Sequence, residues 1–212
     1  MSKGKNKISE AVIRRMPKYY RYLKEMEETG IKRISSRELS KKMGLTASQI
    51  RQDFNCFGGF GQQGYGYNVA ELCEEIQKIL GLDKEYNMIV IGAGNLGQAL
   101  ANYSGFEQEG FKIRALFDIN PRLVGISIRD IPILDIDQIE VFLSKYDVHI
   151  AAVCTPKKTA QEIVDYLVEC GVKGIWNFAP IDVDVPDDVV VENVHLSDAL
   201  YTISLKMNED YV

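Results

Sequence analysis

The spacing of apolar residues changes along the chain, with a break near residue 86. Before the break, apolar residues recur at the three- and four-residue spacing of amphipathic helices. The expected helices cover residues 10–16, 18–30, 35–43, 46–55 and 69–80, with Pro17 separating the first two. Residues 81–85 are the expected linker, so we predict an N-terminal domain over residues 1–81.

After the break, short apolar runs alternate with helical stretches, as a doubly wound parallel sheet requires. We expect strands at residues 88–91, 112–117, 131–134, 148–154, 174–178 and 189–191, and helices at 96–109, 136–145 and 157–170. The predicted fold is therefore α/β, with a Rossmann-like domain over residues 86–195 that follows the helical N-terminal domain in sequence.

A last helix is expected within residues 196–212, with Ser197 as its cap. Its apolar residues recur at intervals of four, three and four: Leu196, Leu200, Ile203 and Met207. This apolar face either docks on its own domain or on that of a second copy. We favour the second copy, because proteins that read DNA with a helix usually dimerise.

A glycine-rich turn follows the first predicted strand. Gly92, Gly94 and Gly97 have the G-x-G-x-x-G spacing of a dinucleotide-binding loop, and they lie between a strand and a helix. Backbone N–H groups at the start of such a helix bind phosphates. The predicted phosphate loop consists of Gly92, Ala93, Gly94, Asn95, Leu96 and Gly97.

Asp118 ends the next predicted strand, roughly 20 residues after the last glycine. A carboxylate there accepts a hydrogen bond from a ribose 2′-hydroxyl and repels a 2′-phosphate, which favours NAD(H) over NADP(H). The alternative is a glycine turn in an α/β domain that binds no nucleotide. Ligands of such sheets bind outside the carboxyl ends of the strands. This adds Thr155, Pro156, Asn177, Ala179 and Pro180 as candidates, although ordinary loops explain them equally well.

The N-terminal domain contains a helix-turn-helix pattern. Ser35 with Glu38, and Thr46 with Gln49, have capping-box spacing, and Gly44 lies in the turn between the two helices. On the second helix we expect Ser48, Gln49, Arg51 and Gln52 to face outward as residues that read base edges. The alternative is a solvated helix face on an unrelated helical domain.

The segment after this helix holds five glycines within residues 58–67. Glycines beside aromatic residues favour a hairpin wing over a flexible linker, because plain spacers are rich in glycine and serine instead. We expect the wing to contact DNA through Phe60, Gln62, Gln63 and Tyr67.

Charge supports a nucleic-acid partner for the first part of the chain only. Residues 1–67 hold 14 lysines and arginines against 6 acidic residues, whereas residues 68–212 hold 11 against 24. No apolar run is long enough for a membrane span, and no secretory signal is recognisable, so a cytoplasmic protein is expected. The four cysteines and two histidines are scattered, and we expect no metal site, no disulfide and no catalytic constellation.

Together these motifs, followed by Asn102-Tyr103-Ser104-Gly105-Phe106, resemble the bacterial redox-sensing repressor family Rex over nearly the whole chain. The resemblance implies a homodimer that binds palindromic operators in double-stranded DNA and leaves them when NADH accumulates. It implies that Tyr103 lies near the nicotinamide of NADH or NAD+. It also implies that the terminal helix is exchanged between subunits, so that Leu196 helps to close the partner's pocket.

Two departures from the family pattern concern the wing and the cofactor pocket. Gln62 and Gln63 stand where basic residues are common, and His195 stands where an aspartate usually partners the tyrosine. His195 remains a candidate cofactor contact. Two other classes of function fit the pattern: a small NAD-dependent dehydrogenase with a basic oligomerisation domain, and a CoA-binding protein.

Overall fold

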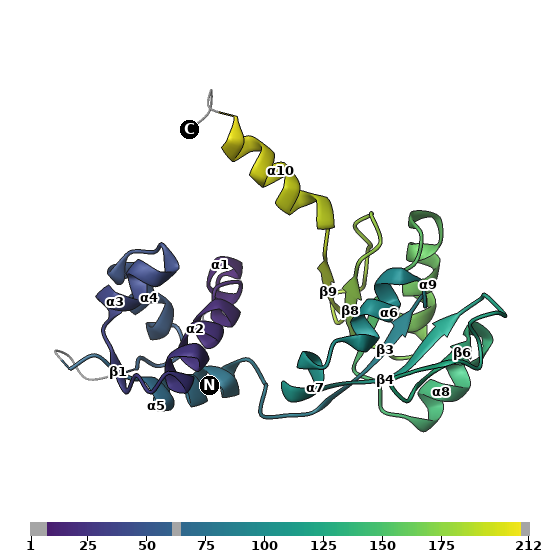
Figure 1. The fold of residues 1–212 in the computed structure, drawn as a ribbon, viewed down its shortest axis with the longest axis horizontal. Helices are drawn as coiled ribbons and strands as arrows, with labels where there is room; N and C mark the ends of the chain where they lie inside the picture. The colour runs from purple at the N-terminus through teal and green to yellow at the C-terminus, as the bar shows by residue number, and fades with distance from the viewer. Residues whose placement is uncertain (1–7, 61–64, 209–212) are drawn as a thin grey trace, which may run out of the picture. The chain divides into compact units, whose positions relative to one another are not determined.

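The computed structural model describes residues 8–60 and 65–208 of the 212-residue chain. Contacts divide the chain into two compact units, with the boundary after Lys84. Figure 1 shows the elements of both units, which are described separately below.

The first unit is a small helical domain with a two-stranded sheet. Its elements are α1 (Glu10–Ile13), α2 (Met16–Glu28), β1 (Arg33–Ile34), α3 (Ser36–Met43), α4 (Ala47–Asn55), β2 (Tyr67–Asn68) and α5 (Val69–Ile79). One apolar cluster joins them, with Tyr19, Leu23, Leu39, Ile50 and Ile76 among its most buried members. The helix-turn-helix pair is formed by α3 and α4.

Pro17 lies within a helix instead of separating two helices. The first predicted helix was too long, since α1 ends at Ile13 and Pro17 lies in the first turn of α2. Proline is tolerated there because the first N–H groups of a helix have no partner within the helix.

The predicted caps of α3 and α4 are confirmed. The Ser35 hydroxyl accepts from the Glu38 N–H, and the Glu38 carboxylate accepts from the Ser35 N–H, which completes the capping box of α3. The Thr46 hydroxyl accepts from the Gln49 N–H at the start of α4. These bonds fix where α3 and α4 begin, and therefore which side chains share each face.

The predicted wing falls partly on residues 61–64, which include Gln62 and Gln63 and lie outside the described residues. The strand after this segment, β2, pairs antiparallel with β1, so that Tyr67 lies opposite Ile34. The pairing partner of β2 thus comes from before α3, which the local glycine pattern did not indicate.

The second unit is built on a seven-stranded sheet in the order β5-β6-β4-β3-β7-β8-β9. The strands are β3 (Tyr86–Ile91), β4 (Phe111–Asp118), β5 (Ser127–Ile128), β6 (Ile131–Asp135), β7 (Ile150–Val153), β8 (Gly174–Asn177) and β9 (Val190–Asn193). All neighbours pair in parallel except β5, an edge strand that the sequence analysis missed. The order of the six parallel strands is that of a Rossmann fold, which confirms the predicted fold class.

Helices cover both faces of this sheet (Figure 1). One face packs on α8 (Ile139–Lys145), which follows the 3-10 turn η1 (Ile136–Gln138), and on α9 (Lys157–Glu169). The other face carries α6 (Asn95–Asn102) and α7 (Gly105–Gln108). We expected one helix over residues 96–109, but the backbone of Tyr103 is extended and separates two shorter ones.

The last helix, α10 (Leu196–Met207), buries none of its residues within the chain. Its N-cap residue is His195, and no side chain caps it, so the predicted cap at Ser197 is wrong. Among the described residues, no helix combines the length and the apolar character that a bilayer span requires.

Candidate functional site

The glycine loop connects β3 to α6 next to the end of β7. Gly92 has a φ of +97°, a conformation that side chains disfavour, and a Cβ there would lie 2.7 Å from the Cys154 carbonyl oxygen. At Gly97 a Cβ would lie 1.9 Å from the Gly92 carbonyl oxygen. Both positions therefore need glycine so that strand, turn and helix can pack together.

Gly94 requires a different explanation, because a Cβ there would meet no described atom within 4 Å. Its φ of −73° is ordinary, and it is the N-cap residue of α6 without a side-chain cap. The first N–H groups of α6 consequently have no side-chain acceptor at the cap, and the space beside them is open. A phosphate fits this arrangement, since it accepts from helix N-terminal N–H groups at close approach.

Asp118 lies beside this loop at the end of β4. Its carboxylate accepts from the Ala93 N–H at 2.6 Å and from the Asn120 N–H at 2.8 Å. Each carboxylate oxygen has a second lone pair, so both can still accept from ribose hydroxyls. The carboxylate thus holds the loop and is in place to bind a ribose.

Thr155 provides a second indication that a ligand belongs at this edge. Its hydroxyl oxygen is buried and has no hydrogen-bond partner among the described residues. An unsatisfied buried hydroxyl costs about 1–3 kcal/mol, which a polar ligand group would offset. Pro156, the exposed N-cap residue of α9, follows directly. The neighbouring Cys154 thiol is no reactive group, because burial raises its pKa to about 12.

Asn177 holds a loop. It is fully buried, its amide N–H groups donate to the Ile181 carbonyl and to Asn193, and its oxygen accepts from the Ala179 N–H. Its side chain is thus engaged by the loop that carries buried Ala179 and exposed Pro180, and its contribution to a cofactor site is indirect.

The carboxyl ends of five neighbouring strands bring most of these candidates into one row. Strand β4 ends at Asp118, and the next four strands in the sheet, β3, β7, β8 and β9, are followed by Gly92, Thr155, Ala179 and His195. This row includes the switch point between β3 and β7, where ligands of doubly wound sheets bind.

Tyr103 lies at the opposite end of α6 from the glycine loop, about 12 Å along the helix axis. Its exposed ring packs against Phe106, which contacts Trp176, which in turn contacts Phe178. These four aromatic residues form a continuous row on the α6 side of the sheet. A role for Tyr103 near the nicotinamide stays a prediction.

His195 pairs with the loop after β8. Its Nε2 atom lies 2.8 Å from the Asp182 carboxylate, and Asp198 adds negative charge from the first turn of α10. The hydrogen bond to Asp182 raises the pKa of His195 above the usual 6.5. The ion pair links the base of α10, where Leu196 is exposed, to the loop of Ala179 and Pro180.

A pH titration of the His195 ring by NMR is expected to give a pKa above 6.5 that falls in Asp182→Asn. Since the folded-state pKa is raised, the pair stabilises the fold below pH 6.5, and this contribution disappears as the pH rises through the folded-state value. Asp147→Asn, next to His149, is the control. An unchanged His195 pKa in Asp182→Asn would contradict the assignment.

The outward face of α4 carries the candidate base-reading residues. Ser48, Arg51 and Gln52 are exposed, as expected, and the Arg51 guanidinium donates to the Ser36 hydroxyl at 3.0 Å. Asn55 is exposed on the same face, one turn beyond Arg51 and Gln52. The sequence analysis missed Asn55, although its spacing of seven from Ser48 places it there and asparagine suits adenine edges.

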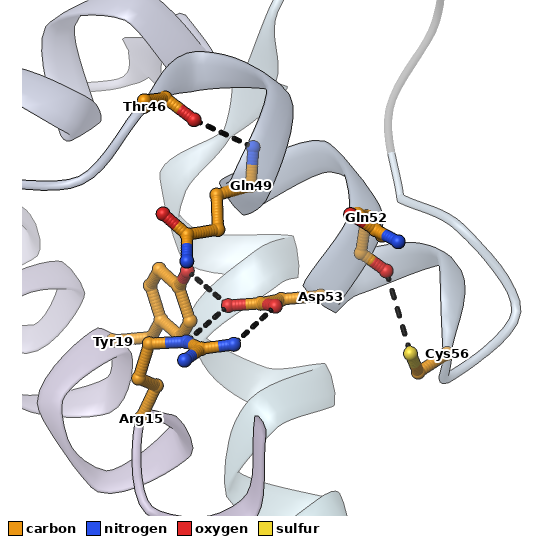
Figure 2. Close-up of polar contacts among 7 residues, drawn as sticks. All are labelled: Arg15, Tyr19, Thr46, Gln49, Gln52, Asp53 and Cys56. Carbon is orange, nitrogen blue, oxygen red and sulfur yellow. Dashed lines mark hydrogen bonds and ion pairs between the residues drawn. The ribbon is translucent and has the colours of Figure 1, made fainter. Parts of the chain in front are cut away.

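Three other predicted DNA contacts, unlike Ser48, are partly or fully buried. Gln49 is half-buried, and its side chain extends on the side of α4 where Tyr19 lies (Figure 2). Phe60 is partly buried against Phe54, and Tyr67, only 8% exposed, packs on Phe54 as well. Packing on the core is therefore the observed role of these two aromatic rings, which the glycine-rich context had not indicated.

The exposed Cys56 thiol donates to the Gln52 carbonyl (Figure 2). All four cysteines are free of disulfides. No cluster of metal-ligating side chains occurs within the described ranges.

Comparisons with known proteins match two separate parts of the chain to family models. A family model described as a CoA binding domain matches residues 83–181, and one described as a putative DNA-binding protein N-terminus matches residues 7–55. A crystal structure of RSP in complex with β-NAD+ and operator DNA has a TM-score of 0.91 and 60% identity, over 96% of this chain and 94% of that chain. RSP in complex with β-NADH has a TM-score of 0.90 and 57% identity, over 97% and 96%.

Relatives of similar length share more than half of the sequence. The redox-sensing transcriptional repressor Rex of Thermoanaerobacter pseudethanolicus is 61% identical over 99% of this chain and 93% of the relative. The Clostridium botulinum repressor of the same name is 59% identical over 99% of both chains. The chain therefore belongs to the Rex family of redox-sensing transcriptional repressors.

Proposed function

We propose that this chain is a repressor that binds a palindromic operator through residues 1–81, binds NAD(H) through residues 86–195, and leaves the operator when NADH binds. The observation that carries the proposal is the row of candidate cofactor-binding residues at the carboxyl ends of the strands. The chain that contains this row is 60% identical to a protein crystallised with β-NAD+ and operator DNA. The exposed face of α4 supports the DNA-binding part, because arginine, glutamine and asparagine suit base edges in the major groove.

We assign the cofactor to NAD(H) from the surroundings of Asp118. Its carboxylate is in place to accept hydrogen bonds from ribose hydroxyls. It would repel a phosphate group on the same ribose, which both NADP(H) and CoA carry. The loop Gly92–Gly97 would hold the pyrophosphate through the N–H groups of α6, and the Thr155 hydroxyl would gain a partner.

The redox response needs a difference in affinity between two states of the protein. The nicotinamide ring is positively charged in NAD+ and neutral in NADH, so an apolar pocket disfavours the oxidised form through desolvation. The aromatic row of Tyr103, Phe106, Trp176 and Phe178 offers such a surface in this unit. NADH would then favour a dimer whose DNA-binding domains no longer match successive major grooves, roughly 34 Å apart.

The proposal includes a homodimer joined through the segment of residues 196–212, which contains α10. Leu200 and Ile203 on this helix are 64% and 52% exposed, and an isolated helix of this length is marginal in water. A second copy of the chain would bury this face. Two-fold symmetry also matches a palindromic operator.

We assign no catalytic turnover to the cofactor site. A dehydrogenase needs an acid–base group beside the nicotinamide. His195 and Asp182 form a titratable pair after β8 and β9, but their hydrogen bond serves to join the base of α10 to its own domain. Operator binding would place the protein in the cytoplasm, with the DNA.

The test is a mobility shift with a duplex that the wild-type protein selects from a random library. NADH is expected to release this duplex at concentrations where NAD+ does not. Equal responses to the two forms would refute the redox sensor, and turnover of NADH with a small carbonyl compound would favour the dehydrogenase. CoA serves as the control ligand and is expected to have no effect.

A further inference from the structure

Asp53 is a buried carboxylate on the inner face of the proposed DNA-reading helix. It is 2% exposed, although it belongs to the same helix as exposed Arg51 and Gln52. The Arg15 guanidinium donates to both of its oxygens, at 2.7 and 2.8 Å, and the Tyr19 hydroxyl donates at 2.7 Å (Figure 2). Asp53 is thus held by three hydrogen bonds from residues at the start of α2.

The three groups form a closed network. Tyr19 is fully buried, and burial together with the bond to Asp53 raises the pKa of its hydroxyl, which stays protonated and donates. The same carboxylate raises the pKa of Arg15, which keeps its charge. A network with every member satisfied is rigid, whereas a buried carboxylate without partners would be strongly unfavourable.

Within the buried core the other contacts of α4 are apolar, chiefly through Ile50 and Phe54, and the Arg51–Ser36 hydrogen bond lies on the exposed surface. Apolar burial has no directional preference, so it permits small rotations of a helix about its axis. A bidentate guanidinium–carboxylate pair permits much less, because two parallel hydrogen bonds fix distance and angle together. Among these contacts, the Arg15–Asp53 pair is therefore the one that fixes the rotation of α4.

Rotation of α4 determines what its outward face can read. With side chains, a helix has a radius of about 5–6 Å, so a rotation of about 10° moves the tips of Ser48, Arg51 and Gln52 by about 1 Å. A shift of that size exceeds the tolerance of a hydrogen bond to a base edge. Contacts to phosphates from long lysine and arginine side chains adjust more easily, and they carry no sequence information.

We propose that the network of Arg15, Tyr19 and Asp53 positions α4 for sequence discrimination, and that its contribution to the stability of the fold is secondary. Buried ion pairs often add little net stability, because desolvation offsets their attraction. Arg15 and Asp53 are thus positioning residues that touch no DNA themselves. This inference rests on the proposed DNA-binding function of α4.

The test replaces the whole network with apolar side chains of similar size: Arg15→Met, Tyr19→Phe and Asp53→Leu together. This variant leaves no buried polar group unpaired, so we expect it to fold with a thermal midpoint near that of the wild type. Its preference for the selected duplex over a scrambled one is expected to fall about tenfold or more, the loss of one good base contact. The salt dependence of its binding to scrambled DNA is expected to stay unchanged, since the phosphate contacts remain.

Two further variants separate positioning from stability. Ile76→Val lies in the same core on α5 and is expected to lower the thermal midpoint without changing discrimination. Arg51→Ala removes a proposed base contact and is expected to lower discrimination directly. If the triple variant discriminates as well as the wild type, the inference is overturned. If the wild type itself shows no preference among duplexes, the proposed function fails instead.

Should the triple variant fail to fold, Tyr19→Phe alone still tests the inference. It keeps the charged pair and removes one of the three hydrogen bonds to Asp53. Discrimination is expected to fall by a smaller factor than in Arg51→Ala, in a protein that remains folded by circular dichroism. Unchanged discrimination in folded Tyr19→Phe would overturn the role of the network.

Discussion

Replacing Gly94 with alanine is expected to abolish the response to NADH while the fold and the operator affinity remain intact. The new Cβ meets no atom within 4 Å in the described chain, and the φ of −73° suits alanine. The pyrophosphate, in contrast, must approach the backbone at this point. Displacing it from the N–H groups of α6 removes two or three charge-assisted hydrogen bonds, so NADH affinity is expected to fall on the order of 100-fold.

The measurement combines NADH fluorescence titration with a mobility shift at an NADH concentration that just saturates the wild type. The expected Gly94→Ala protein is a repressor that stays on its operator when NADH is added. Ala99→Ser, on an exposed position of the same helix, is the matched control. Gly97 is less suitable, because a Cβ there would collide with the Gly92 carbonyl and disturb the protein itself. Undiminished NADH affinity in Gly94→Ala would mean that the cofactor does not lie on this loop.

Local sequence patterns predicted most of the fold. The caps at Ser35 and Thr46 and the glycine spacing after β3 depend on neighbours within a few residues, and the structure has them where the pattern indicated. Alternating strands and helices likewise predicted the parallel sheet. Edge strand β5 was missed because two residues are too few to form a period.

The failures concern contacts between segments distant in sequence. Tyr67 was expected on a DNA-binding wing, but strand pairing with Ile34 turns its ring toward Phe54. No pattern around residue 67 reveals a partner more than thirty residues earlier. For the same reason, no local pattern indicated that Asp53 is buried, since its partner Arg15 is 38 residues away.

The candidate cofactor-binding residues at the strand ends were predicted only in part. Asp118 was found by its spacing from the glycines, and its bond to the Ala93 N–H agrees with that reasoning. Asn177 was selected because it lies at the carboxyl end of a strand, yet its buried amide oxygen accepts from the Ala179 N–H. Position at a strand end predicts proximity to a ligand, but only the hydrogen bonds reveal which side chains remain available for it.

Aspartate at both Leu200 and Ile203 is expected to convert the proposed dimer into monomers and to weaken operator binding by about two orders of magnitude or more. Two linked DNA-binding domains act at a high effective concentration, and separating them removes this gain of roughly 10²–10⁴. Sedimentation analysis measures the mass, and a mobility shift with the selected duplex measures the affinity. Thr202→Asp, between Asp198 and Lys206 on the polar side of α10, is the matched control.

The large apolar side chains of α10 are exposed within its own chain. Since none of its residues is buried there, two aspartates on it remove no contact from the described core, and each separate chain is expected to stay folded by circular dichroism. A loss of affinity in a folded monomer then has one cause, the absence of a second copy. A double variant that remains dimeric with full operator affinity would mean that the copies associate elsewhere, and that the apolar face of α10 has a different partner.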